Sequence, residues 1–276
     1  MFEDKIFPLD SWVSVAVDWL VENHRDFFQA IKWPVEQTLN GLDAGFNALH
    51  PLIVIALVAF AAYRFSNKGL AVFTVLSMVL IGTLGLWEDT MTTLAMVLSS
   101  VVFCGLVGVP VGICSGRSNR FEASLRPVLD AMQTTPAFVY LVPIVMLFSV
   151  GNVAGVLATI IFAIPPVIRL TSLGIRQVHP ELIEAAQAFG ATRGQVLRRV
   201  QIPLAMPTIM AGLNQTIMMA LSMVVIASLI GAGGLGSPVT RGLNTLDIGQ
   251  AVIGGLGIVL MAIILDRITQ GMAQKS

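Results

Sequence analysis

The sequence predicts an all-α protein that crosses a lipid bilayer several times. Of its 276 residues, 55% are hydrophobic and only 12% are charged, and the mean hydropathy is +0.83. Soluble domains are typically about 25% charged, so this composition favours a polytopic integral membrane protein. The apolar residues also gather in uncharged blocks, several of which reach the roughly 20 residues that a spanning helix needs.

The uncharged blocks predict seven spanning helices. The block at 131–168 is too long for one helix, and the run Ser149-Val150-Gly151-Asn152 inside it is typical of a tight turn between two spans. The block at 202–240 holds one span and then a glycine-rich tail. We therefore expect spans near 49–64, 69–87, 91–114, 136–150, 152–169, 208–230 and 248–265, the fourth being short and starting as early as Met132.

Residues 1–48 are expected to form an amphipathic segment outside the core. Charges from Glu3 onward exclude a signal peptide. A polar stripe predicts a helix, broken near Pro34, that lies either in the membrane interface or against the protein's own outer loops. The stripe consists of Asp18, Glu22, Arg25, Gln29, Lys32, Glu36, Asn40 and Asp43, with Trp12, Trp19, Leu20, Phe27, Phe28, Ile31, Val35 and Leu39 on the other faces.

The basic residues predict the orientation, because short cytoplasmic loops are enriched in Lys and Arg. An outer N-terminus and a cytoplasmic C-terminus place 12 of the 16 basic residues inside. Lys5, Arg25, Lys32 and Arg241 then lie outside. The inner set is Arg64, Lys68, Arg117, Arg120, Arg126, Arg169, Arg176, Arg193, Arg198, Arg199, Arg267 and Lys275.

No metal or catalytic set is expected. Cys104 and Cys114 lie ten residues apart in one predicted helix, a rise of about 15 Å, which is too far for a disulfide. The three histidines are dispersed. No hydrolase, zinc or phosphate-loop motif is present.

A glycine run follows the sixth predicted span. Gly231-Ala232-Gly233-Gly234-Leu235-Gly236 fits G-x-G-x-x-G, but a dinucleotide site needs a strand before the motif, whereas a long apolar helix is expected here. We interpret the run as a flexible re-entrant or gating turn on the periplasmic side, where glycines allow tight turns and close backbone packing. The candidate gate residues are Gly231, Gly233, Gly234 and Gly236.

Residues 177–207 form a charged island between apolar spans. Pro180 suits the first turn of a helix, and Gly190 suits its C-terminal cap. A second short helix is expected from Thr192, with Gln195 completing a capping box, and should end before Pro203. The alternative is an ordinary loop with solvated charges.

The island carries a recognisable pattern. Glu184-Ala185-Ala186 with Gly190, followed by Ile202-Pro203-Leu204 and Pro207, resembles the EAA loop of membrane subunits of bacterial ABC importers. The segment from Glu181 to Gly236 resembles the permeases of the glycine betaine, proline and choline uptake branch. The resemblance covers Thr90 to Arg267, including Pro127 and Gln133-Thr134-Thr135-Pro136.

The resemblance implies an organisation. The permease core of a type I importer, with five helices, would occupy 90–267, after two accessory helices at 49–89 and before a tail at 268–276. Two copies would pair, and each would present a coupling helix to a cytoplasmic ABC ATPase. The chain itself would bind no cofactor and be no enzyme, since ATP and Mg would bind in the ATPase. The implied coupling residues are Glu184, Ala185, Ala186, Gly190 and Ala191.

Other partners and the location follow from the same resemblance. A periplasmic or lipid-anchored substrate-binding protein would dock near Glu88-Asp89 and the stretch Leu235 to Asp247, and no nucleic acid is involved. The location would be the bacterial inner membrane.

The spans show no ionisable side chain at mid-membrane, which disfavours a strongly charged solute. A zwitterion or quaternary ammonium compound fits better: glycine betaine, choline, carnitine or proline. For each candidate path residue, helix packing or an interhelical hydrogen bond is the alternative. The competing classes are an ion-coupled secondary transporter and a membrane scaffold or intramembrane enzyme. The candidate path residues are Phe103, Phe138, Tyr140, Asn214 and Gln215.

Overall fold

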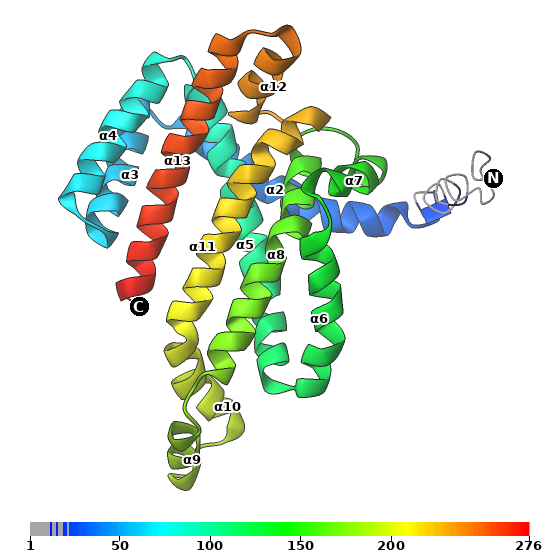
Figure 1. The fold of residues 1–276 in the computed structure, drawn as a ribbon, viewed down its shortest axis with the longest axis vertical. Helices are drawn as coiled ribbons and strands as arrows, with labels where there is room; N and C mark the ends of the chain where they lie inside the picture. The colour runs from blue at the N-terminus through cyan, green and yellow to red at the C-terminus, as the bar shows by residue number, and fades with distance from the viewer. Residues whose placement is uncertain (1–11, 13–14, 16–18, 21, 276) are drawn as a thin grey trace, which may run out of the picture.

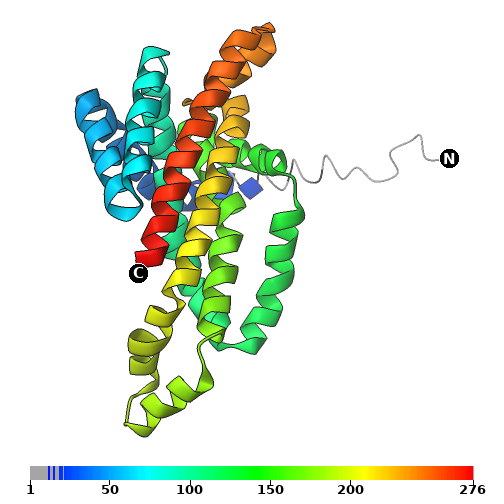
Figure 2. The same ribbon diagram turned by 60° about the vertical axis from the view of Figure 1, so that its left-hand side comes forward.

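The computed structural model describes Trp12, Val15, Trp19, Leu20 and residues 22–275, and every regular element in this part of the chain is a helix. The expectations about Glu3 and Asp18 concern residues outside it. Four long helices run side by side in Figures 1 and 2: α5 (Trp87–Arg117), α8 (Asn152–Arg176), α11 (Ile202–Ala227) and α13 (Ile248–Lys275).

The helix α8 lies between α5 and α11, and small residues set its spacing from both. Gly108, Gly112 and Gly116 stand four residues apart on the face of α5 that meets α8. A Cβ at Gly112 would lie 2.5 Å from the Cβ of Thr171, and one at Gly116 would lie 2.9 Å from the Cβ of Ile175. Glycines at this spacing let two backbones approach closely, so α5 and α8 form one tightly packed pair.

The predicted number of seven spans is not confirmed. Within the described part of the chain, four helices are long and apolar enough to cross a membrane: Trp87–Arg117, Asn152–Arg176, Arg193–Ile230 and Ile248–Ala273. Two bent pairs raise the number to six if each pair is one span. The first pair joins α2 (Arg25–Ala48) to α3 (Pro51–Phe65) at 110°, and α4 (Lys68–Thr83) is a shorter apolar helix.

The second bent pair corrects the fourth predicted span. The helix α6 (Asn119–Thr134) is followed by the short 3-10 helix η1 (Ala137–Tyr140) and by α7 (Leu141–Phe148), at an angle of 105° to α6. Pro136 explains the bend, because the residue before a proline avoids the helical region, and Thr135 is extended with ψ 125°. The helical segment at 137–148 lies within the fourth predicted span at 136–150, whereas the early start at Met132 is wrong, because Met132 belongs to α6.

The turn predicted at 149–152 is confirmed. Ser149 has φ +69° and Gly151 has φ +117°, and these residues separate α7 from α8. The long helices also extend beyond the predicted spans, since α8 continues through Pro165 and Pro166 to Arg176. Uncharged blocks mark only the apolar middle of a helix that continues into polar surroundings.

The amphipathic helix α2 crosses the long helices near one end (Figure 1). The predicted break near Pro34 is wrong, because α2 is continuous from Arg25 to Ala48. Its second half packs on the bundle through buried Val35 and Leu39, and Thr92 Oγ1 donates to Asp43 Oδ1 at 2.9 Å. This half thus packs on helices of the bundle, whereas the predicted alternative placed the helix against the protein's outer loops. The side chain of Trp33 on the same helix takes no part in this packing, since it is 65% exposed.

Candidate functional site

The charged island folds into a knob at one end of the molecule. The helices α9 (Pro180–Ala188) and α10 (Arg193–Val196), with the π-helical turn η2 (Leu197–Gln201), lie beyond the ends of α5 and α8 (Figure 1). We call residues 177–201 the knob. No residue of α9 is buried, and Phe189 is 93% exposed. A helix that buries none of its own residues presents its surface to a partner or to solvent.

Local hydrogen bonds fix the turn after α9. The N–H of Ala191 donates to Ala186 O at 3.0 Å, and the N–H of Gly190 donates to Gln187 O at 2.8 Å. This pair of bonds is a Schellman motif, which needs the left-handed conformation that Gly190 adopts with φ +83°. The predicted role of Gly190 as the residue that ends the helix is therefore confirmed.

The second half of the knob is capped as expected and continues into the next helix. Thr192 Oγ1 accepts from the N–H of Gln195, and the side chain of Gln195 accepts from the N–H of Thr192 at 2.8 Å, which completes the predicted capping box. The α-helix itself ends at Val196, before Pro203 as predicted, but the chain stays helical beyond it. It passes through η2 into α11, where Pro203 lies in the first turn.

The five predicted coupling residues gather on the knob. Glu184, Ala185 and Gly190 are exposed, while Ala186 and Ala191 are half-buried. Behind them lies a polar cavity of about 280 Å³ between the knob and the end of α5. The arrangement is a short helix with an exposed carboxylate and small neighbours, which suits insertion into a groove. The cavity is lined by Gly116, Arg117, Ile183, Gln187, Arg193, Val196 and Gln201.

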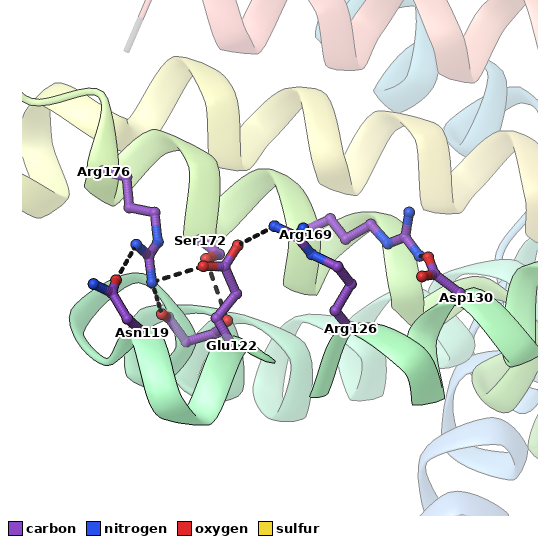
Figure 3. A network of polar contacts seen from close by, with 8 residues as sticks. Asn119, Glu122, Arg126, Asp130, Arg169, Ser172 and Arg176 are labelled. Atoms are coloured by element: carbon purple, nitrogen blue, oxygen red, sulfur yellow. Dashed lines mark hydrogen bonds and ion pairs between the residues drawn. The ribbon is translucent and has the colours of Figure 1, made fainter. Parts of the chain in front are cut away.

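A charged network joins the base of the knob to α6 (Figure 3). Arg176, the last residue of α8, donates to Asn119 Oδ1 at 2.6 Å and to Ser115 O at 2.8 Å. It also pairs with Glu122 at 3.0 Å, and Arg126 pairs with the same carboxylate at 3.1 Å. No sequence pattern predicts this network, although Arg176 stands directly before the charged island.

The glycine run lies at the other end, before α12 (Gly236–Thr245). It follows helix α11 and the 3-10 turn η3 (Ser228–Ile230) rather than a strand, which agrees with rejecting a nucleotide site. The N–H of Gly233 donates to Asn152 Oδ1 at 2.6 Å, and the N–H of Leu235 donates to Thr93 Oγ1 at 2.8 Å. The run is thus tied to α8 and α5 by hydrogen bonds, and its role as a gate stays a prediction.

Close packing of this run is confirmed. Gly231 and Gly234 have φ +78° and +83°, conformations that favour glycine. A Cβ at Gly236 would lie 2.4 Å from Val224 O, closer than any side chain can approach. The start of α12 at Gly236 therefore packs directly against the backbone of α11.

The predicted path residues do not share one environment. Phe138 and Gln215 are exposed, whereas Phe103 is partly buried against the core. Tyr140 donates its hydroxyl to Met132 O at 2.5 Å, across the bend after α6. Asn214 donates to Asp266 Oδ1 at 2.9 Å and accepts from Thr269, so its amide links α11 to α13. Asn214 therefore makes an interhelical hydrogen bond, which was the alternative to a place on the translocation path.

Comparison with known proteins identifies the family. Residues 108–275 match the family described as "Binding-protein-dependent transport system inner membrane component". The glycine betaine/proline betaine transport system permease protein ProW of Escherichia coli is 54% identical over 275 residues, which cover 100% of this chain and 78% of that protein. The glycine betaine transport system permease protein OpuAB of Bacillus subtilis is 45% identical over 268 residues, 97% of this chain and 95% of that protein.

A solved structure agrees with these relatives. The chain superposes on the MetNI methionine ABC transporter in an inward-facing conformation with a TM-score of 0.56 and 25% identity, covering 66% of this chain and 90% of that chain. The sequence matches, the likeness in fold and the run of apolar helices point to one class of membrane protein. The chain belongs to the family of binding-protein-dependent transport system inner membrane components, the permease subunits of ABC importers.

Proposed function

We propose that this chain is the transmembrane subunit of an ATP-driven importer that translocates a small compatible solute of the glycine betaine class. The observation that carries the proposal is the 54% identity to a glycine betaine/proline betaine permease over the whole chain. The likeness in fold to an ABC importer disfavours the alternative, an ion-coupled secondary transporter of a zwitterion. Choline, carnitine and proline are the other solutes to be tested.

The knob is the proposed contact with a cytoplasmic ABC ATPase subunit. Its exposed α9 offers the carboxylate of Glu184 for a charge-assisted hydrogen bond, and the small side chain of Ala185 allows close approach. ATP and Mg would be held by that partner, and movement of the knob would open the permease to alternate sides. The concentration of arginines near the knob supports a cytoplasmic position for it.

Further partners complete the proposed importer. A second copy of this chain would supply the other half of the translocation path, since a single copy leaves the polar side chain of Gln215 exposed on a long apolar helix. A periplasmic or lipid-anchored binding protein would deliver the solute at the end where α12 lies. The N-terminus would then lie outside and the C-terminus in the cytoplasm of the cell that carries it.

Reconstitution tests the substrate class. The chain is placed in proteoliposomes with its ATPase and its binding protein, and ATP hydrolysis is measured with glycine betaine, choline, carnitine or proline. We expect glycine betaine to stimulate hydrolysis and to accumulate in the lumen. Stimulation by none of the four solutes would contradict the proposed substrate class.

Charge reversal on the knob tests the ATPase contact. Glu184→Lys should reduce co-purification of the ATPase subunit, because a carboxylate acceptor is replaced by a cation at the proposed interface. Glu88→Lys is the matched control, since it makes the same change at an exposed carboxylate in the first turn of α5, at the opposite end of that helix from the knob. Equal recovery of the ATPase with both variants would remove Glu184 from the contact.

A further inference from the structure

The helix α6 is attached to the rest of the protein mainly by charged groups. Its single buried residue is Leu129, whereas α8 buries residues along its whole length. Two ion pairs join α6 to α8: Glu122 with Arg176, and Asp130 with Arg169. Between the two pairs lies a cavity of about 310 Å³. An element held in this way can shift against its neighbour without opening a packed apolar core.

Arg176 occupies a special position in this attachment. It ends α8, and only residues 177–179 separate it from α9. Its guanidinium contacts two elements at once, the last turn of α5 through Ser115 O and the start of α6 through Asn119 and Glu122 (Figure 3). A planar guanidinium can hold several acceptors in fixed directions, which a point charge cannot do.

The ends of α5 and α8 behave as one body beside this residue. A Cβ at Gly112 would lie 2.7 Å from Ile168 O, and one at Gly116 would lie 3.1 Å from Ser172 O. The side chains of Ser172 and Ser115 are also joined at 3.3 Å. A displacement of the knob therefore reaches both helices together. The start of α6 follows α5 after Ser118 alone, and side chains set how α6 lies against α8.

The other end of α6 leads to two candidate path residues. After the bend at Pro136 come Phe138, which is 61% exposed, and Tyr140. The Tyr140 hydroxyl is bonded to Met132 O in the last turns of α6, so the segment η1 is tied to α6 across the bend. A shift of α6 would consequently carry Phe138 and Tyr140 with it.

We propose that Arg176 is the positioning residue that transmits movement of the knob to α6, and through α6 to the bend at Phe138 and Tyr140. The proposal rests on the proposed function, in which the ATPase drives the knob. Glu122 is the charged acceptor on α6, beside the amide oxygen of Asn119. Arg126 contacts the same carboxylate from within α6, four residues along the helix, so it plays no part in transmission between helices.

The test measures uptake per ATP hydrolysed in proteoliposomes that contain the complete importer, supplied with glycine betaine. Arg176→Ala should lower this ratio at least about fivefold while hydrolysis stays within about twofold, because coupling between sites is lost and the ATPase contact is kept. Glu122→Gln should also lower the ratio, though by less, because Asn119 and Ser115 O still accept from Arg176. The double variant should lose no more than Arg176→Ala, since that change already removes the contact with Glu122.

Arg126→Ala is the matched control and should keep the wild-type ratio. An Arg176→Ala variant with a wild-type ratio would overturn the proposal, and so would an equal loss with Arg126→Ala or additive losses in the double variant. Should Arg176→Ala fail to assemble with the ATPase, Arg176→Lys decides. A lysine keeps the positive charge but cannot hold several acceptors in fixed directions as a guanidinium does. The ratio of uptake to ATP hydrolysed should therefore be intermediate, and a wild-type ratio would again overturn the proposal.

The proposed function fails in a different way. If the wild-type complex shows no ATP-dependent uptake of any of the four solutes, the function is wrong. If wild type transports and Glu184→Lys loses the ATPase while the Arg176 variants transport normally, only the role of Arg176 falls.

Discussion

The two ends of the molecule are built on opposite principles. At one end, α9 buries none of its residues, and both Glu184 and Phe189, which directly follows α9, are exposed. At the other end, the glycine run from Gly231 to Gly236 is hydrogen-bonded to Asn152 and Thr93. It is packed so closely that Gly236 has no room for a Cβ. The knob therefore keeps its shape through local caps and leaves its surface free for a partner. The glycine run keeps its shape by tertiary contacts and closes the bundle.

The largest effect is expected at the packed end, from Gly236→Ala. The new Cβ would lie 2.4 Å from Val224 O and 3.0 Å from the Cα of Val225, so the backbone of α12 or α11 must move. We expect a loss of stability on the order of 3 kcal/mol, measured by thermal unfolding of the purified protein in detergent. Gly194→Ala on the knob, where a Cβ meets nothing within 4 Å, is the control. Equal melting temperatures for the two variants would refute the contrast.

The next effect is expected from Asn152→Ala, which removes the acceptor of the Gly233 N–H. An unsatisfied, partly buried N–H costs about 2 kcal/mol. Hydrogen exchange at Gly233 should accelerate, whereas Asn152→Asp keeps an oxygen acceptor and should protect this amide. An unchanged exchange rate in the alanine variant would show that the run is held by packing alone.

A smaller effect is expected on the knob from Gly190→Ala. A Cβ there has open space, but φ +83° disfavours alanine by about 1 to 2 kcal/mol. Because the Schellman bonds are local, amides of residues 180–191 should exchange faster while the global melting temperature stays constant. A drop in the global melting temperature would mean that the knob is part of the cooperative core.

The smallest effect is expected from Thr192→Ala, which removes half of the capping box. Loss of an N-cap costs about 1 kcal/mol, and Thr192→Ser should retain the bond to the N–H of Gln195. The measurement is exchange at Gln195 and Val196, and faster exchange in both variants would argue against the cap.

The sequence predicted what depends on local pattern. The caps at Gly190 and Thr192 and the turn at Ser149 to Asn152 follow from residue types at fixed spacing, and all three are present. The bend after Thr134 and the continuity of α2 through Pro34 were missed, because a proline permits either a bend or an uninterrupted helix and neighbouring contacts decide which forms.

Contacts between distant segments were harder to predict. The bond from Asn214 to Asp266 and the network around Arg176 join residues about 50 to 60 positions apart, which no local periodicity reports. The glycines at 108, 112 and 116 did carry a readable signal, since their spacing of four marks one helix face.

We propose that ATP, rather than an ion gradient, drives transport through this chain. To test this, uptake of glycine betaine is followed in proteoliposomes holding the chain, its ATPase and its binding protein, with ATP depleted in one sample and ion gradients collapsed in another. We expect uptake to stop without ATP and to continue without the gradients. Uptake that survives ATP depletion and stops when the gradients collapse would contradict it.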